Sequence, residues 1–263
     1  MSTQIDVQTL FQAAQSSGTL STAAMHALTI ADIGAMIQAG LGTLVDDVMA
    51  SEAVLVTMMP DDSGSIRFAG NAQVVRDGHN LVLESLQHSQ QRDSILAHTR
   101  FLNGHVLFPY CPILQTVQLD THNYDPALGT PLYDQTVVLL GTVLAKAQEF
   151  AENGVPVRTV TLLITDGADA HSQRATAQTV ATLVHDMRQA ETHIVAAMGI
   201  DDGSTDFRQV FRDMGIEDQW ILTPGNDANQ IRRAFQVFSQ SAVRVSQSAA
   251  HFGQAVLGGF GTP

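Results

Sequence analysis

The sequence Ala53-Val-Leu-Val-Thr-Met-Met59 is an apolar run that leads into the polar loop Asp61-Asp-Ser-Gly-Ser65. An apolar run without regular polar alternation predicts a strand buried on both faces, as the strands of parallel sheets are. The loop places carboxylates and hydroxyls just beyond the carboxyl end of that strand. We therefore expect residues 53–59 to form a central strand with chemically active side chains at its end.

Segments with strand and helix character alternate along the rest of the chain. Apolar stripes at helical spacing start at Ala72, Val137, Ala177, Phe207 and Ala228, and the strand-like segments are residues 94–102, 106–108, 159–164, 193–198 and 220–222. This alternation predicts an α/β fold with a doubly wound, mostly parallel central sheet and helices on both faces. Ligands of such sheets bind beyond the carboxyl ends of the strands, where the strand order reverses.

The two ends of the chain differ from this central part. Residues 1–50 have helical spacing and no chemical motif, so we expect a helical N-terminal extension. Residues 51–248 form the expected main domain, and the glycine-rich residues 249–263 are expected to be a flexible tail.

Composition and charge limit the classes of partner. Acidic residues outnumber basic ones by 26 to 13, which disfavours nucleic acid and anionic membrane surfaces. Residues 22–41 are apolar but contain His26, Asp32 and Gln38, so we expect no membrane span. The first residues lack a secretory signal and Cys111 is the only cysteine, which together favour the cytoplasm.

Hydroxyls and carboxylates occur in three separate loops at predicted strand or helix ends. They are the loop 61–65, the segment Gly129-Thr-Pro-Leu-Tyr-Asp134 before a helix, and Thr165-Asp-Gly167 after a strand. Hard oxygen ligands without His or Cys suit Mg²⁺, Mn²⁺ or Ca²⁺, and the small number of carboxylates favours a partly hydrated octahedral ion such as Mg²⁺. Each segment alone is also typical of an ordinary turn or helix cap.

Taken in order, these three segments resemble the metal-ion-dependent adhesion site of von Willebrand factor A domains, over about residues 53–246. The resemblance implies that the hydroxyls of Ser63, Ser65 and Thr130 are metal ligands. It also implies that Asp61 and Asp166 hold the ion directly or through water. In that family an Asp or Glu of a partner protein completes the metal site, which implies a protein-binding module that is not an enzyme.

Four further carboxylates are expected on the rim around the metal, where they would influence the choice of partner: Asp62, Asp169, Asp201 and Asp202. The simpler and more common explanation is a solvated acidic rim, and a second cation site is the alternative. His122 lies between Asp120 and Asp125, but this spacing matches no helix-based pair of transition-metal ligands.

The main alternative is a Mg²⁺-dependent phosphotransferase of the haloacid dehalogenase type with Asp61 as nucleophile. Such enzymes need a second Asp two residues later as general acid, and Ser63 occupies that position. A scaffold with a vestigial metal site is a third possibility, although all five ligand positions keep suitable side chains.

The C-terminal segment 235–248 resembles the last helix of stand-alone bacterial A-domain proteins associated with tellurite resistance. This looser resemblance implies a bacterial stress response and a partner in an ATPase or kinase-linked system, by analogy alone.

Overall fold

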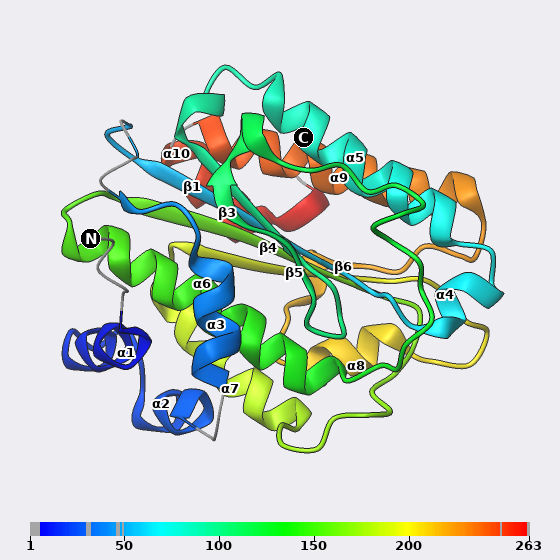
Figure 1. The fold of residues 1–263 in the computed structure, drawn as a ribbon, viewed down its shortest axis with the longest axis horizontal. Coiled ribbons are helices and arrows are strands. Elements are labelled where there is room, and N and C mark those ends of the chain that lie inside the picture. The colour runs from blue at the N-terminus through cyan, green and yellow to red at the C-terminus, as the bar shows by residue number, and fades with distance from the viewer. Residues whose placement is uncertain (1–5, 30–32, 46–47, 49, 248, 262–263) are drawn as a thin grey trace.

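A six-stranded sheet forms the centre of the computed structural model, which describes residues 6–29, 33–45, 48, 50–247 and 249–261 (Figure 1). The strand order is β3-β2-β1-β4-β5-β6, and every neighbouring pair is parallel except β2 and β3. The strands are β1 (Ala53–Pro60), β2 (Ile95–Arg100), β3 (Val106–Pro112), β4 (Val157–Thr165), β5 (His193–Gly199) and β6 (Ile221–Leu222). The expected doubly wound, mostly parallel sheet is confirmed.

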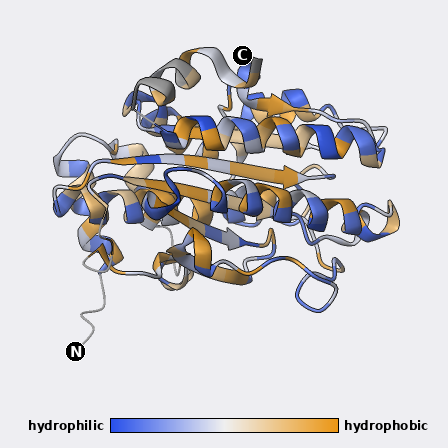
Figure 2. Cartoon of the chain, turned by 90° about the horizontal axis from the view of Figure 1, so that it is seen from above, coloured by the Kyte–Doolittle hydropathy of each residue, from blue (hydrophilic) through white to orange (hydrophobic). Residues whose placement is uncertain are grey.

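Helices cover both faces of this sheet (Figure 1). One layer contains α5 (Ala72–Gln87), α9 (Ala228–Gln247) and α10 (Ala249–Gly258). The opposite layer contains α3 (Ile33–Leu41), α6 (Leu132–Glu152), α7 (Ala177–Gln189) and α8 (Phe207–Asp213). Short helices are α4 (Gly64–Phe68), η2 (Arg92–Ser94), η3 (Ile113–Gln115), η4 (Asp218–Trp220) and η5 (Gly259–Gly261). In Figure 2 the strands are mostly apolar, whereas the helices carry both polar and apolar residues.

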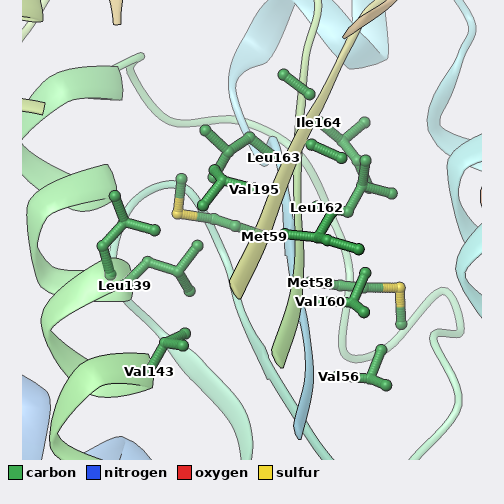
Figure 3. Packing of buried hydrophobic residues seen from close by; sticks show 14 of the residues in the cluster. Val56, Met58, Met59, Leu139, Val143, Val160, Leu162, Leu163, Ile164 and Val195 are labelled. Carbon is green, nitrogen blue, oxygen red and sulfur yellow. The ribbon is translucent and has the colours of Figure 1, made fainter. Parts of the chain in front are cut away.

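The central strands are buried on both faces, as the apolar run predicts. Alternate residues of β1 and β4 point to opposite helix layers, so that Met59 and Leu163 lie on the side of Leu139 in α6 (Figure 3). Their neighbours Met58 and Leu162 point the other way (Figure 3). The two strands are in parallel register from Ala53↔Val157 to Pro60↔Ile164, which brings their carboxyl ends together.

The N-terminal helices α1 (Val7–Ser16), α2 (Thr22–Thr29) and α3 pack against α6 and α7 and share the main hydrophobic core. The apolar side of α1 includes Phe11, which is fully buried. Two buried cations hold the end of this segment: Arg100 Nη2 donates to the Met36 carbonyl (2.9 Å), and Lys146 Nζ donates to the Thr43 carbonyl. The division at residue 50 remains a prediction.

The C-terminal residues differ from the expected flexible tail. Residues 249–258 form α10, and the ring of Phe260 packs edge-on against Trp220, with a centroid distance of 4.9 Å. Phe252 is buried as well. Aromatic packing and the apolar face of α10 hold the described part of this segment on the domain, despite its glycines.

Within the described part of the chain, no single helix combines the length and apolar composition needed to cross a membrane. Among the described helices, α2 and α3 taken together reach that length and apolar composition, but the pair is bent by 95°.

Candidate metal centre

The sheet topology brings the three predicted loops to one end of the molecule. Asp61 directly follows β1 and Asp166 directly follows β4, and these strands are parallel neighbours. The segment before α6 joins them through a parallel bridge between Ser63 and Leu128, in which the Gly64 N–H donates to the Leu128 carbonyl (3.0 Å). The loops therefore converge at the end of the sheet where α4 lies (Figure 1).

A continuous hydrogen-bond network connects four of the five predicted ligands. Asp61 accepts from the Ser63 N–H at Oδ1 (2.7 Å) and from the Thr165 hydroxyl at Oδ2 (2.6 Å). The Ser63 and Ser65 hydroxyls are 2.8 Å apart, and Ser65 Oγ donates to Asp166 Oδ1 (2.5 Å). These four residues thus place several oxygen atoms close to one another, as a hard cation requires.

Thr130, the fifth predicted ligand, lies beside this network. A Cβ added to Gly167 would be 3.7 Å from Thr130 Oγ1, so the hydroxyl lies next to the residue that follows Asp166. The backbone holds Thr130 firmly: its N–H donates to His171 Nδ1 (2.8 Å), and its carbonyl accepts from the N–H groups of Ala170 (3.1 Å) and His171 (3.2 Å). The structure therefore brings all five predicted ligands together.

Gly129 explains how the Thr130 loop can lie so close to His171. A Cβ on Gly129 would lie 2.9 Å from the His171 ring, which is closer than side-chain carbons normally approach. The glycine is therefore required for the ring to reach the Thr130 N–H. Nothing in the spacing of His171 along the sequence indicates this hydrogen bond, because its partner is a backbone group 41 residues away.

Asp62 does not lie on the rim, where it was expected. Its side chain is buried, and Oδ1 accepts from the Asn103 N–H (2.9 Å) and from Asn103 Nδ2 (2.8 Å). The same Nδ2 also donates to the Gly129 carbonyl (2.7 Å). Because the chain alternates direction along Asp61-Asp62-Ser63, Asp62 points away from the other carboxylates and instead ties the first loop to the Thr130 loop.

The other rim candidates remain near the site. Asp201 and Asp202 are exposed, and the negative charge of Asp202 contributes to the raised pKa of Asp166. Asp169 is half-buried and accepts from the Ser172 hydroxyl (2.5 Å) and, at 3.3 Å, from the Tyr133 N–H. Their effect on partner choice remains a prediction.

The electrostatics of the site favour a cation. Burial raises the pKa of Asp61, and burial together with the charge of Asp61 raises the pKa of Asp166 to about 6. Neither carboxylate forms an ion pair within the described residues. Burial of two carboxylates without a counter-charge destabilises the folded state, and a bound divalent ion would remove this destabilisation.

The donor set fits Mg²⁺, Mn²⁺ or Ca²⁺ better than a softer metal. Among the described residues, no group of three or more His, Cys, Asp or Glu side chains lies close enough together to hold a metal. His122 is an exposed loop residue, and the carboxylate of Asp120 accepts from its backbone N–H (2.7 Å). The candidate site therefore depends on hydroxyl ligands, which suit hard cations.

Two further residues position Asp61. The buried Tyr124 hydroxyl donates to the Asp61 backbone carbonyl, and Thr165 Oγ1 accepts from the Gly167 N–H (3.1 Å) while it donates to Asp61. Thr165 was identified in the motif Thr-Asp-Gly but not assigned this role. Tyr124 was not identified, since its contact is long-range.

Solved structures with a similar fold are proteins of diverse origin. The pilus adhesin SpaC from Lactobacillus rhamnosus GG superposes with a TM-score of 0.52 and 15% identity, over 73% of this chain and 30% of the adhesin. Proximal thread matrix protein 1 from the mussel byssus superposes with a TM-score of 0.50 and 15% identity, over 74% of this chain and 48% of that protein. The chain shares the fold of both proteins. It spans less than half the length of either.

A protein described as von Willebrand factor type A from Catenulispora acidiphila superposes less well, with a TM-score of 0.45 and 15% identity, over 74% of this chain and 43% of that chain. The sequence matches no protein-family model and no curated protein. The similarity therefore establishes the fold, and the roles of individual residues depend on the geometry described above.

Replacing His171 tests how the Thr130 loop is positioned. We expect His171→Ala to weaken Mn²⁺ binding about tenfold, because residues that orient metal ligands typically contribute at least that much. Its stability should change little, since His171 is exposed. Calorimetric titration of Mn²⁺ measures the affinity, and the exposed His122→Ala is the matched control. Equal affinity in wild type and His171→Ala would show that the ring does not position a ligand.

Proposed function

We propose that this protein is a divalent-metal-dependent protein-binding module and not an enzyme. The observation that supports this most strongly is the pair Asp61 and Asp166, which are buried, linked through serine hydroxyls and not neutralised by any described cationic side chain. An ion of the Mg²⁺ class, with Mn²⁺ or Ca²⁺ as substitutes, would neutralise this pair.

Asp61, Ser63, Ser65, Thr130 and Asp166 are the residues that would hold the ion. The ion would supply an electrophilic centre that binds a carboxylate from outside, because two carboxylates leave a divalent cation without excess negative charge. Ser65 is exposed, so this side of the site is open to a partner. Asp62, Tyr124 and Thr165 would keep the loops fixed.

The proposed partner is a protein that presents an Asp or Glu side chain to the ion. The description of one structure with this fold as a pilus adhesin is compatible with such a role. The geometry gives no support for the phosphotransferase alternative, because Ser63 occupies the position two residues after Asp61 and its hydroxyl contacts Ser65.

The cellular setting belongs to this proposal as well. A single, half-buried Cys111 and the resemblance of the last helix to tellurite-associated bacterial proteins support a cytoplasmic stress-response role. An ATPase or kinase-linked system is the corresponding source of partners, by analogy alone.

Thr130→Ala tests the metal-bridged interaction. It removes one neutral ligand without changing the formal charge of the site, so partner affinity should fall at least tenfold while stability changes by about 1 kcal/mol or less. A partner captured from a lysate of the source organism in Mg²⁺ would be titrated calorimetrically into wild type and Thr130→Ala, with Mg²⁺ and with EDTA. Equal, EDTA-insensitive binding to both proteins would place the partner elsewhere on the molecule.

A further inference from the structure

Two large apolar side chains are exposed next to the candidate metal centre. Phe68, the last residue of α4, is 89% exposed, and Leu128, two residues before Thr130, is 58% exposed. Most other large apolar residues of the described chain are buried, so this exposure next to a predicted binding site stands out from the general pattern.

Gly64 connects these two side chains to the metal loop. A Cβ added to Gly64 would lie 3.5 Å from Phe68 Cε2, so the aromatic ring lies back over this glycine. The Gly64 N–H also donates to the carbonyl of Leu128 (3.0 Å). Since Gly64 lies between Ser63 and Ser65, and Leu128 is the parallel-bridge partner of Ser63, both apolar residues lie beside the proposed hydroxyl ligands. We call Phe68 and Leu128 the apolar shoulder.

The negative charge of the protein limits what long-range electrostatics contribute to binding an acidic segment at this site. The chain has a formal net charge of −13, and Asp125, Asp201 and Asp202 are exposed around the site. The nearby cation Arg67 already forms an ion pair with Asp125. Long-range electrostatics therefore repel an acidic partner, and its carboxylate is attracted only at short range by the ion. Burial of apolar surface is a short-range attraction that does not depend on this charge balance.

We propose that the partner segment presents an acidic side chain together with a large apolar side chain within two positions of it. The carboxylate binds the ion, and the apolar side chain packs against the apolar shoulder. This inference rests on the proposed metal-dependent binding and specifies the class of sequence that the site selects. A carboxylate flanked by small polar residues would gain the metal contact alone.

Selection from a random library of disulfide-cyclised peptides displayed on phage tests this directly, in Mg²⁺ and in EDTA. The proteins are wild type, Asp61→Asn, the double variant Phe68→Ser with Leu128→Ser, and the control Leu114→Ser with Val117→Ser. Leu114 and Val117 are 58% and 46% exposed and lie in or just after η3, which packs beside the start of β2. The control therefore removes a similar exposed apolar pair away from the metal loops.

The proposal predicts that wild type and the control enrich, in Mg²⁺ only, peptides in which Asp or Glu lies within two positions of a large apolar residue. The selected peptides should bind the Phe68/Leu128 double variant at least tenfold more weakly, and Asp61→Asn should not bind them. Enrichment of acidic peptides without neighbouring apolar residues, or equal affinity for the double variant, would overturn this inference and leave the metal-dependent function intact. Metal-independent enrichment, or no enrichment of acidic peptides, would contradict both.

Discussion

Acidification from pH 7 to pH 4 is expected to unfold the protein. Burial lowers the pKa of His79 and of His193 from 6.5 to about 4. Burial, together with the adjacent Arg100 guanidinium, lowers the pKa of His98 to about 3. The folded protein therefore keeps three neutral imidazoles in a pH range in which the unfolded chain binds protons.

The sign and size of the effect follow from proton linkage. Because the unfolded state binds more protons below pH 6.5, the free energy of unfolding falls as the pH decreases, until the folded pKa values are reached. For each histidine whose pKa is lowered from 6.5 to about 4 by folding, the free energy of unfolding of the protein decreases by about 3 kcal/mol over this range. Three such residues approach the total stability of a typical domain, about 5–15 kcal/mol. Urea unfolding curves at a series of pH values measure this loss.

His79→Gln isolates the contribution of one histidine. The Gln amide can replace the hydrogen bond between His79 Nε2 and Thr99 Oγ1 (3.0 Å) without a titratable group. In metal-free protein the raised pKa values of Asp61 and Asp166 make the free energy of unfolding rise as the pH decreases, which opposes the effect of the histidines. Wild type and His79→Gln share this contribution, so it cancels when their free energies of unfolding are subtracted. The wild-type slope should exceed that of the variant by about 1 kcal/mol per pH unit between pH 4.5 and pH 6, because the unfolded state then binds nearly one proton more than the folded state at this position. If the free energy of unfolding depended on pH in the same way in wild type and His79→Gln, the result would contradict the lowered pKa of His79.

Phe11→Ala is expected to destabilise the whole protein by about 3–5 kcal/mol. Phe11 lies in α1, is fully buried and belongs to the hydrophobic core that also contains the sheet residues. Truncation of a buried aromatic residue removes its apolar burial and leaves a cavity. Chemical denaturation should show one cooperative transition at a lower midpoint, because the N-terminal helices and the sheet share a core.

Phe68→Ala is the matched control for this measurement. It makes the same chemical change at a side chain that is 89% exposed, so the free energy of unfolding should change by no more than about 0.5 kcal/mol. A similarly small effect of Phe11→Ala would mean that residues 1–50 are a separable extension, as the sequence suggested.

The order of strands and helices could be predicted because the main domain repeats one pattern. The apolar run at 53–59 and the stripe starting at Ala72 became β1 and α5, with starting residues as predicted. The parallel order of β1 and β4 then places Asp61 beside Asp166, so the main features of the metal centre follow from strand ends and motif order. Such local periodicities are encoded by residues that are close in sequence.

Features determined by distant residues could not be predicted. The Tyr124 hydroxyl reaches a backbone carbonyl 63 residues away, and the direction of Asp62 depends on Asn103 in another loop. The C-terminal segment was expected to be flexible because glycine is frequent there, whereas Phe260 packs against Trp220. In each case the partner is brought close by the tertiary fold, and no short sequence window contains that information.

Thermal unfolding with and without Mg²⁺ tests the central claim most directly. An ion that binds only the folded state stabilises it by about 2.7 kcal/mol at a hundredfold excess over Kd, which raises the Tm by about 5 °C or more for a chain of this length. Asp61→Asn should abolish this rise. The neighbouring Asp62→Asn makes the same change in charge at a residue that contacts Asn103, so it should keep the rise. A full Mg²⁺-dependent shift in Asp61→Asn, or no shift in wild type, would contradict the assignment of this site as a metal centre.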